Sequence, residues 1–220
     1  MIKIIVGNKA YSSWSLRGWL ALKQSGLPFV EEVVSLYDDA WTTRRQQPDI
    51  APSAGKVPIM WDGDVAVWES LAIVDYLADK VGHDRFWPAD EAARGFARSI
   101  AAEMHAGFVD LRRECPTVFR KRYPTKAISA DAQANVDRIV QLWEQALTRF
   151  GGDGGFLFGA FSAADIMYAP VVTRFTTYAL PIPDFAQAYC ERMLAQPFVA
   201  EWMAAAHAEP WVIEKFEAAE

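Results

Sequence analysis

The chain has few cysteines and no long apolar run. Two of its 220 residues are cysteine, Cys115 and Cys190, and neither has the partner spacing of a zinc site or a redox pair. We expect both to be buried thiols, with no bound metal. No apolar stretch approaches the roughly 18 residues that span a bilayer. The chain opens on a strand-like MIKIIVG without a secretory leader, so we expect a cytoplasmic protein that does not enter a membrane.

An excess of positive charge is also missing. The formal net charge is −6, which argues against a general nucleic-acid binder, because phosphate contacts need clustered lysine and arginine. The one basic stretch, RRECPTVFRKRYPTK, is better interpreted as a solvated helix end and loop than as a polyanion site. With 52% hydrophobic and 23% charged residues, the composition is that of an ordinary globular protein with a sizeable core.

The first part of the chain alternates strand and helix patterns. The segments IKIIVG and FVEEVVSL are predicted to be strands, and the helix predicted between them ends at Gly26. A short helix is predicted near DDAWTTRRQQ. VPIMW and VAVW, separated by DGD, predict a hairpin, and a helix is predicted from Ser70 to Val81. This βαβαββα order predicts a thioredoxin-like α/β domain over residues 1–81, followed by a linker over 82–91.

The remainder, residues 92–220, is expected to be an all-helical bundle domain. The segments ARGFARSIAAEMHAGFVDLRR and SADAQANVDRIVQLWEQALTRF place apolar residues at helical spacing, and further helices are predicted near 163–178, 184–195 and 197–207. In FSAADIM, Ser162 and Asp165 have the spacing of a capping box, for which we expect a role in folding. The glycines of GGDGG read as a turn.

The most informative motif runs from Val57 to Ser70. A cysteine-containing peptide can add as a strand beside Val57 while a helix that begins at Ser70 receives its carboxylate, and the spacing permits both. This stretch, with Pro58, Glu69 and the later SxxD helix start, resembles the glutathione site and helical domain of cytosolic glutathione transferases, nearest to the serine-type zeta and theta-like classes.

The resemblance implies a homodimeric detoxification enzyme that joins the glutathione thiolate to a small, mostly apolar electrophile. Two alternatives stay open. One is a glutathione-dependent isomerase similar to maleylacetoacetate isomerase, although the zeta SSC motif is SSW here. The other is a non-catalytic transferase-like interaction module. Peroxide reduction by the same thiolate is compatible with the motif, whereas glutathione-disulfide chemistry is disfavoured, because no cysteine stands at the helix start.

The resemblance implies that a hydroxyl at the start of the first helix activates the glutathione thiol. A free thiol with a pKa of about 8.5 is mostly protonated at neutral pH, so a donated hydrogen bond at the positive helix end would favour the thiolate. By its spacing to Arg17 and Gly26, Ser13 matches the zeta-like pattern and is the first candidate. Ser12 is the second, and capping of the helix is the alternative role for these serines. Tyr11 is a weaker candidate, because other transferase classes use a tyrosine there.

The expected glutathione contacts are spread along the same motif. A cis bond before Pro58 would turn the Val57 amide and carbonyl outward, toward the cysteinyl backbone. Glu69 would pair with the γ-glutamyl ammonium, Ser70 would bind the γ-glutamyl carboxylate, and Lys56 would pair with the glycyl carboxylate. Simple helix capping is the alternative role for Ser70. Arg17 is expected to orient local backbone or an acidic side chain. Residues considered for the second substrate are Trp14, His105, Phe108, Tyr168 and Arg174.

Overall fold

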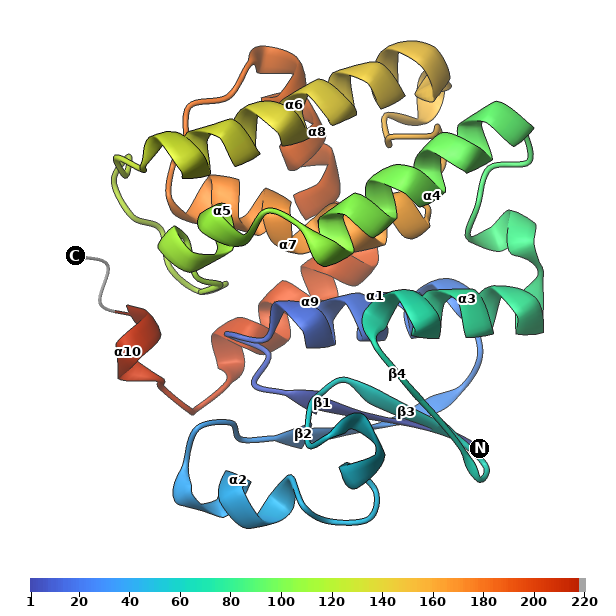
Figure 1. Ribbon diagram of the computed structural model, residues 1–220, viewed down its shortest axis with the longest axis vertical. Helices are drawn as coiled ribbons and strands as arrows, with labels where there is room; N and C mark the ends of the chain where they lie inside the picture. Colours follow the sequence, from blue (N-terminus) through green and yellow to red (C-terminus); the bar gives the residue numbers. More distant parts are fainter. Residues whose placement is uncertain (218–220) are drawn as a thin grey trace.

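The computed structural model describes residues 1–217 and contains a four-stranded sheet beneath a stack of helices (Figure 1). The first part is β1 (Ile2–Gly7), α1 (Ser13–Ser25), β2 (Phe29–Val34), α2 (Asp39–Arg44), β3 (Ile59–Asp62), β4 (Val65–Trp68) and α3 (Ser70–Val81). The sheet order is β2-β1-β3-β4, with β2 parallel to β1 and the other pairs antiparallel. The predicted thioredoxin-like order is therefore confirmed.

Strand β1 has apolar residues on both of its faces. Ile4 and Val6 belong to the main core, on the side covered by α1 and α3, whereas Ile5 packs with Val34 and Ile59 on the opposite side. Successive strand residues point to opposite faces, so an uninterrupted IKIIV run is expected where helices or loops cover both. Figure 1 shows α2 on the far side of the sheet from α1 and α3.

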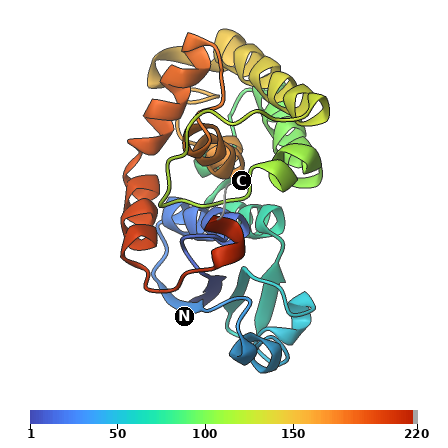
Figure 2. The ribbon, with the colours of Figure 1, turned by 90° about the vertical axis from the view of Figure 1, so that its left-hand side faces the viewer.

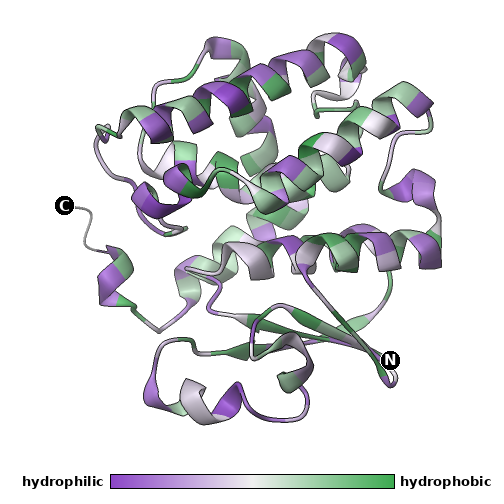
Figure 3. Ribbon diagram, in the orientation of Figure 1, coloured by the Kyte–Doolittle hydropathy of each residue, from purple (hydrophilic) through white to green (hydrophobic). Residues whose placement is uncertain are grey.

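The helical part begins after a short 3-10 turn at His83–Arg85. It comprises α4 (Glu91–Ala106), α5 (Val109–Glu114), α6 (Ala130–Phe150), α7 (Ala163–Thr177), α8 (Asp184–Leu194), α9 (Pro197–Ala208) and α10 (Glu214–Glu217). Further short 3-10 turns are at Ala51–Ser53 and Gly152–Gly154, the latter in the predicted GGDGG turn. In Figure 3, α4 and α6 alternate between hydrophobic and hydrophilic residues, as amphipathic helices do.

One predicted helix is wrong in its extent. The segment read as a single amphipathic helix is divided into α4 and α5, because Phe108 adopts a left-handed backbone conformation with φ 56° directly after Gly107. The break turns α5 away from the axis of α4 (Figure 1) and places Arg112 near Trp14, at the start of α1.

The predicted capping box is confirmed, and it lies in the middle of the protein. Helix α7 is buried along nearly its whole length, and at its start the Asp165 carboxylate accepts hydrogen bonds from the Ser162 amide at 2.9 Å and the Leu157 amide at 3.1 Å. The Tyr189 hydroxyl donates to the same carboxylate at 2.9 Å. One continuous core cluster joins residues of α1, α3 and α7, so the two parts of the fold meet through packed side chains.

Helix α9 and the segment after it return to the first part of the chain. The Trp202 indole donates to the Lys9 carbonyl at 3.0 Å, and Trp202 packs edge-on against Trp19 with ring centroids 5.4 Å apart. Figure 2 shows this C-terminal segment crossing in front of the sheet and ending beside the junction of the two parts.

Candidate functional site

A cavity of about 260 Å³ lies where β3, β4 and the start of α3 meet the start of α1. Its lining includes all five residues that the sequence analysis placed against glutathione: Lys56, Val57, Pro58, Glu69 and Ser70. Ser53, Trp14 and Trp68 complete it. The sequence analysis did not name Ser53, which lies before the motif, or Trp68, which lies within the motif but has no chemistry that marks it as a glutathione contact.

The backbone at Val57 is available for pairing with an extended peptide. The Val57–Pro58 bond is cis, as expected from the sequence, and strand β3 begins only at Ile59. Within residues 1–217, no hydrogen bond involves the Val57 amide or carbonyl. An added strand would satisfy both groups.

Ser53 holds the loop that leads into this edge. Its hydroxyl donates to the Lys56 carbonyl at 2.5 Å and accepts from the Lys56 amide at 3.0 Å. The Ser53 side chain is buried, whereas Lys56 is exposed. The loop therefore presents Lys56 at the rim of the cavity from a fixed backbone.

The start of α3 forms the opposite wall. Glu69 has φ 67° and ψ 124°, a conformation rare for a residue with a side chain, and such strain is commonly found at ligand sites. Ser70 is the first helical residue and not the N-cap, so the capping alternative for Ser70 is wrong. The amides of the first turn lack intrahelical partners and carry the positive end of the helix dipole, an arrangement suited to a carboxylate.

The wall also touches the helical part. The Glu69 carboxylate lies 3.5 Å from Nε2 of His105 on α4, and the Ser70 hydroxyl lies 3.9 Å from the Met167 sulfur on α7. Burial lowers the pKa of His105, and the Glu69 charge opposes that change. A ligand seated here is therefore in reach of groups from both parts of the fold.

The two candidate serines have different local roles. Ser12 is the N-cap of α1: its hydroxyl accepts from the Ser15 amide at 3.3 Å and donates to the Ser15 hydroxyl at 2.7 Å. The capping alternative therefore holds for Ser12. Ser13 is buried in the first turn, and its hydroxyl accepts a hydrogen bond from Nη2 of Arg174 at 3.4 Å. In the described part of the chain, the Ser13 hydroxyl donates no hydrogen bond, and neither Ser13 nor Ser12 is among the residues that line the cavity.

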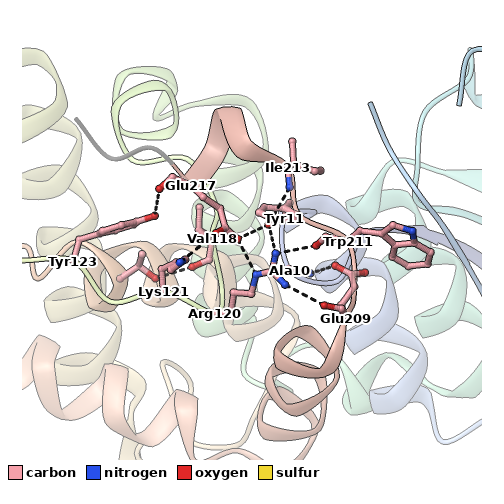
Figure 4. A network of polar contacts seen from close by, with 11 residues as sticks. Ala10, Tyr11, Val118, Arg120, Lys121, Tyr123, Glu209, Trp211, Ile213 and Glu217 are labelled. Carbon is pink, nitrogen blue, oxygen red and sulfur yellow. Dashed lines mark hydrogen bonds and ion pairs between the residues drawn. The ribbon is translucent and has the colours of Figure 1, made fainter. Parts of the chain in front are cut away.

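Tyr11 is occupied elsewhere. Its hydroxyl donates to the Glu217 carboxylate at 2.5 Å and accepts from the Ile213 amide at 3.1 Å and from the Arg120 guanidinium (Figure 4). Burial and the bond to Glu217 raise the pKa of Tyr11. The hydroxyl thus ties the first loop to the C-terminal segment and is poorly placed to activate a thiol.

Glu209 strengthens the same attachment. Its carboxylate accepts from the amides of Lys9 and Ala10 at 2.7 and 2.9 Å, directly before the α1 loop. Arg120 donates to the Glu209 and Trp211 carbonyls at 3.0 and 2.8 Å (Figure 4). The basic stretch that contains Arg120 therefore serves partly as a structural clamp.

Arg17 is fully buried at the back of the site. Its Nε donates to the Met167 carbonyl of α7 at 2.8 Å, so Arg17 binds distant backbone and not the local backbone or acidic side chain that was expected. Nη1 and Nη2 have no hydrogen-bond partner within residues 1–217. Burial and the nearby charges of Arg174 and Arg112 lower the pKa of Arg17 well below its usual range. Burial likewise lowers the pKa of Arg174 to about 10.

The Trp14 ring separates this arginine group from the cavity. Cζ of Arg17 lies 4.5 Å from the Trp14 ring centroid and Cζ of Arg112 lies 5.5 Å from it. A cation–π contact stabilises by about 0.5 to 2 kcal/mol, whereas an ion buried without partners costs several kcal/mol, of the order of 3 to 5. The indole therefore offsets only part of the cost of burying Arg17.

The second-substrate candidates divide into two groups. Trp14, His105 and Arg174 lie around the site, and His105 packs edge-on against Trp14 with ring centroids 5.3 Å apart. Tyr168 is instead a core residue, edge-on to Trp143 at 5.6 Å, and its hydroxyl donates to the Ile100 carbonyl at 3.2 Å. Phe108 is buried at the break between α4 and α5.

The fold and this cavity define a two-part protein in which a thioredoxin-like domain, with an unpaired backbone edge at Val57, lies beneath a helical domain. Family models of the glutathione S-transferase N-terminal and C-terminal domains match residues 11–80 and 126–205. The chain belongs to the glutathione S-transferase family.

Individual relatives are distant. Protein IN2-1 homolog B from Oryza sativa is 27% identical over 180 residues, covering 78% of this chain and 65% of the relative, so the chain spans about two thirds of that protein's length. A glutathione transferase homologue from Burkholderia, solved with bound glutathione, has a TM-score of 0.70 at 22% identity, over 94% of this chain and 98% of the other. A theta class glutathione S-transferase from Xanthomonas axonopodis pv. citri has a TM-score of 0.66 at 21% identity, over 92% and 96% of the two chains.

Proposed function

We propose that this protein is a glutathione transferase that conjugates the glutathione thiolate to a small, mostly apolar electrophile. The observation that carries the proposal is the cavity in which the free Val57 backbone, the start of α3 and Lys56 converge. The cysteinyl backbone pairs with Val57, the γ-glutamyl carboxylate meets the α3 amides and Ser70, the γ-glutamyl ammonium meets Glu69, and Lys56 meets the glycyl carboxylate.

Ser13 supplies the activating hydrogen bond in this proposal, with Ser12 as the second candidate. Two observations support Ser13 over Ser12. The Ser13 hydroxyl donates no hydrogen bond within residues 1–217, and it accepts one from the Arg174 guanidinium, which makes the hydroxyl a stronger donor. A charge-assisted hydrogen bond to sulfur, at the N-terminal end of α1, favours the thiolate over the thiol.

The proposal includes a homodimer in the cytoplasm, as the family resemblance implies. Within residues 1–217, no helix combines the length and apolar character that a membrane span requires. Sedimentation of the purified protein tests the dimer.

Turnover with an activated aryl chloride tests the activity. The thiolate attacks the carbon that bears chlorine, a C–S bond forms, the C–Cl bond breaks, and chloride leaves with the electron pair. We expect chloride release to require glutathione. S-methylglutathione should inhibit the reaction and should not replace glutathione as the nucleophile. Binding of glutathione without any turnover, on aryl chlorides or peroxides, would favour the interaction module.

The isomerase alternative is separated by the fate of glutathione. An isomerase regenerates glutathione, so a cis-enedione acid would be converted to its trans isomer with no loss of free thiol. Consumption of thiol in step with product is the result expected for conjugation.

A further inference from the structure

His105, in the last turn of α4, lies against the wall of the cavity. Its Nε2 atom is 3.5 Å from Oε2 of Glu69, and its ring packs edge-on against Trp14 with ring centroids 5.3 Å apart. Glu69 and Trp14 both line the cavity. Among residues 1–217, no other ion pair or hydrogen bond includes the Glu69 carboxylate. His105 is therefore the neighbour that can set the direction of this carboxylate.

Glu69 has reason to need such a neighbour. Its backbone is in the left-handed half of conformational space, with φ 67°, and its side chain is exposed. An exposed carboxylate samples several rotamers, and fixing one of them on binding costs entropy. A group that already holds one carboxylate oxygen reduces this cost, because the other oxygen then faces the ligand before the ligand arrives.

The surroundings of His105 favour a neutral ring with its proton on Nε2. The Nδ1 atom is buried without a hydrogen-bond partner in the described part of the chain, so a proton there would be a buried donor without an acceptor. Nε2 faces the Glu69 carboxylate, which accepts its proton. Three charged groups face the ring: Glu69, Arg17 from α1 and Arg112 from α5. Burial lowers the pKa of His105, the two arginines lower it further, and Glu69 opposes them.

We propose that His105 is a positioning residue that controls how Glu69 receives the γ-glutamyl ammonium of glutathione. The neutral ring donates from Nε2 to one carboxylate oxygen and leaves the other oxygen for the ammonium. The protonated ring forms an ion pair with Glu69 and repels the ammonium, so acid weakens glutathione binding. This inference rests on the proposed transferase function and adds a pH-dependent control of the same site.

Two ligands that differ only in the ammonium test the role of His105. One is glutathione, and the other is glutaryl-cysteinylglycine, in which a hydrogen atom replaces the amino group. Calorimetric titration gives both dissociation constants, and their ratio is the preference for the ammonium. At about pH 7.5, His105→Ala should lower this preference by about three- to tenfold and change the affinity for the analogue little. His105→Gln should keep most of the preference, because its amide nitrogen can donate from nearly the same place.

The pH dependence of the same ratio separates control by protonation from a purely structural role. Between about pH 7.5 and 5.5, the wild type should lose its preference, whereas His105→Gln, which does not titrate, should keep it. An equal loss of affinity for both ligands in His105→Ala would overturn the proposal. A preference that falls with pH equally in the wild type and in His105→Gln would also overturn it.

Nuclear magnetic resonance tests the contact between His105 and Glu69 without a ligand. The chain has three histidines, so the ring resonance of His105 can be followed as the pH changes. Glu69→Gln should lower the pKa of His105, because the carboxylate no longer stabilises the charged ring. The control is Asp79→Asn, which removes the same charge from the exposed Asp79 beside His83 and should leave the His105 titration unchanged.

The two measurements separate failure of this inference from failure of the proposed function. Glutathione binding by the wild type, together with an unchanged pKa of His105 in Glu69→Gln, would refute the inference and leave the transferase function standing. No binding of either ligand by the wild type would refute the transferase function, and the inference with it.

Discussion

Removal of the Asp165 carboxylate should destabilise the whole protein. In Asp165→Ala, the buried amides of Ser162 and Leu157 and the hydroxyls of Ser162 and Tyr189 all lose their acceptor. An unsatisfied buried donor costs about 1 to 3 kcal/mol. The four losses fall at one buried position and are not additive, so we expect a decrease of about 3 to 5 kcal/mol in the free energy of unfolding.

Urea denaturation followed by circular dichroism measures this loss. For a chain of this size, 1 kcal/mol corresponds to about 2 to 4 °C, so Tm should fall by roughly 6 to 20 °C. Asp165→Asn keeps one acceptor oxygen and should lose about half as much. The control is Asp153→Ala, because Asp153 is exposed in the GGDGG turn, and its effect should stay within about 0.5 kcal/mol. A loss below about 1 kcal/mol in Asp165→Ala would refute the reasoning.

The remaining predictions concern pH, the thiol and the C-terminal clamp. Burial raises the pKa of Asp165 to about 6, above its unfolded value, so its protonation favours the native state. The stability advantage of wild type over Asp165→Ala should therefore be largest near pH 4 and decline as pH rises through about 6, in paired urea titrations. Ser13→Ala should raise the pKa of the bound glutathione thiol by about one to two units, the effect of one charged hydrogen bond. The change should be seen as a loss of thiolate absorbance. Loss of that absorbance in Ser12→Ala and not in Ser13→Ala would assign thiol activation to Ser12. Tyr11→Phe should keep thiolate absorbance but lower the unfolding free energy by about 1 to 2 kcal/mol, since its hydroxyl binds Glu217 and Ile213; loss of the thiolate signal would contradict that assignment. Lys56→Ala should weaken glutathione binding by about three- to tenfold in calorimetry, with no change in Tm without ligand, because Lys56 is exposed.

Features encoded locally were predictable from the sequence. The cis bond before Pro58, the helix that begins at Ser70 and the capping box of Ser162 and Asp165 each depend on a few neighbouring residues. The order of strands and helices followed from their hydrophobic periods in the same way. These features place the cavity, so five of the residues that line it, Lys56, Val57, Pro58, Glu69 and Ser70, were predictable as neighbours.

Features that depend on distant contacts were not predictable. The Tyr11 hydroxyl is bound by Glu217, which is 206 residues away, and nothing near Tyr11 signals that partner. Arg17 and Arg174 come together only because α1 packs against α7. The hydrogen bond from Arg17 to Met167, which joins these helices, connects residues 150 positions apart in the sequence. The break at Phe108 was not predictable because the helical spacing of apolar residues continues across it. Only the Phe108 backbone, which is left-handed, interrupts the helix.

The central claim is that this cavity binds glutathione through the start of α3. Calorimetric titration of the purified protein with glutathione, alongside Ser70→Ala, tests it most directly. The account predicts saturable binding by the wild type at micromolar to millimolar glutathione, weakened in Ser70→Ala by about tenfold, the effect of one hydrogen bond to a carboxylate. No binding to the wild type at millimolar glutathione, or equal binding by Ser70→Ala, would contradict it.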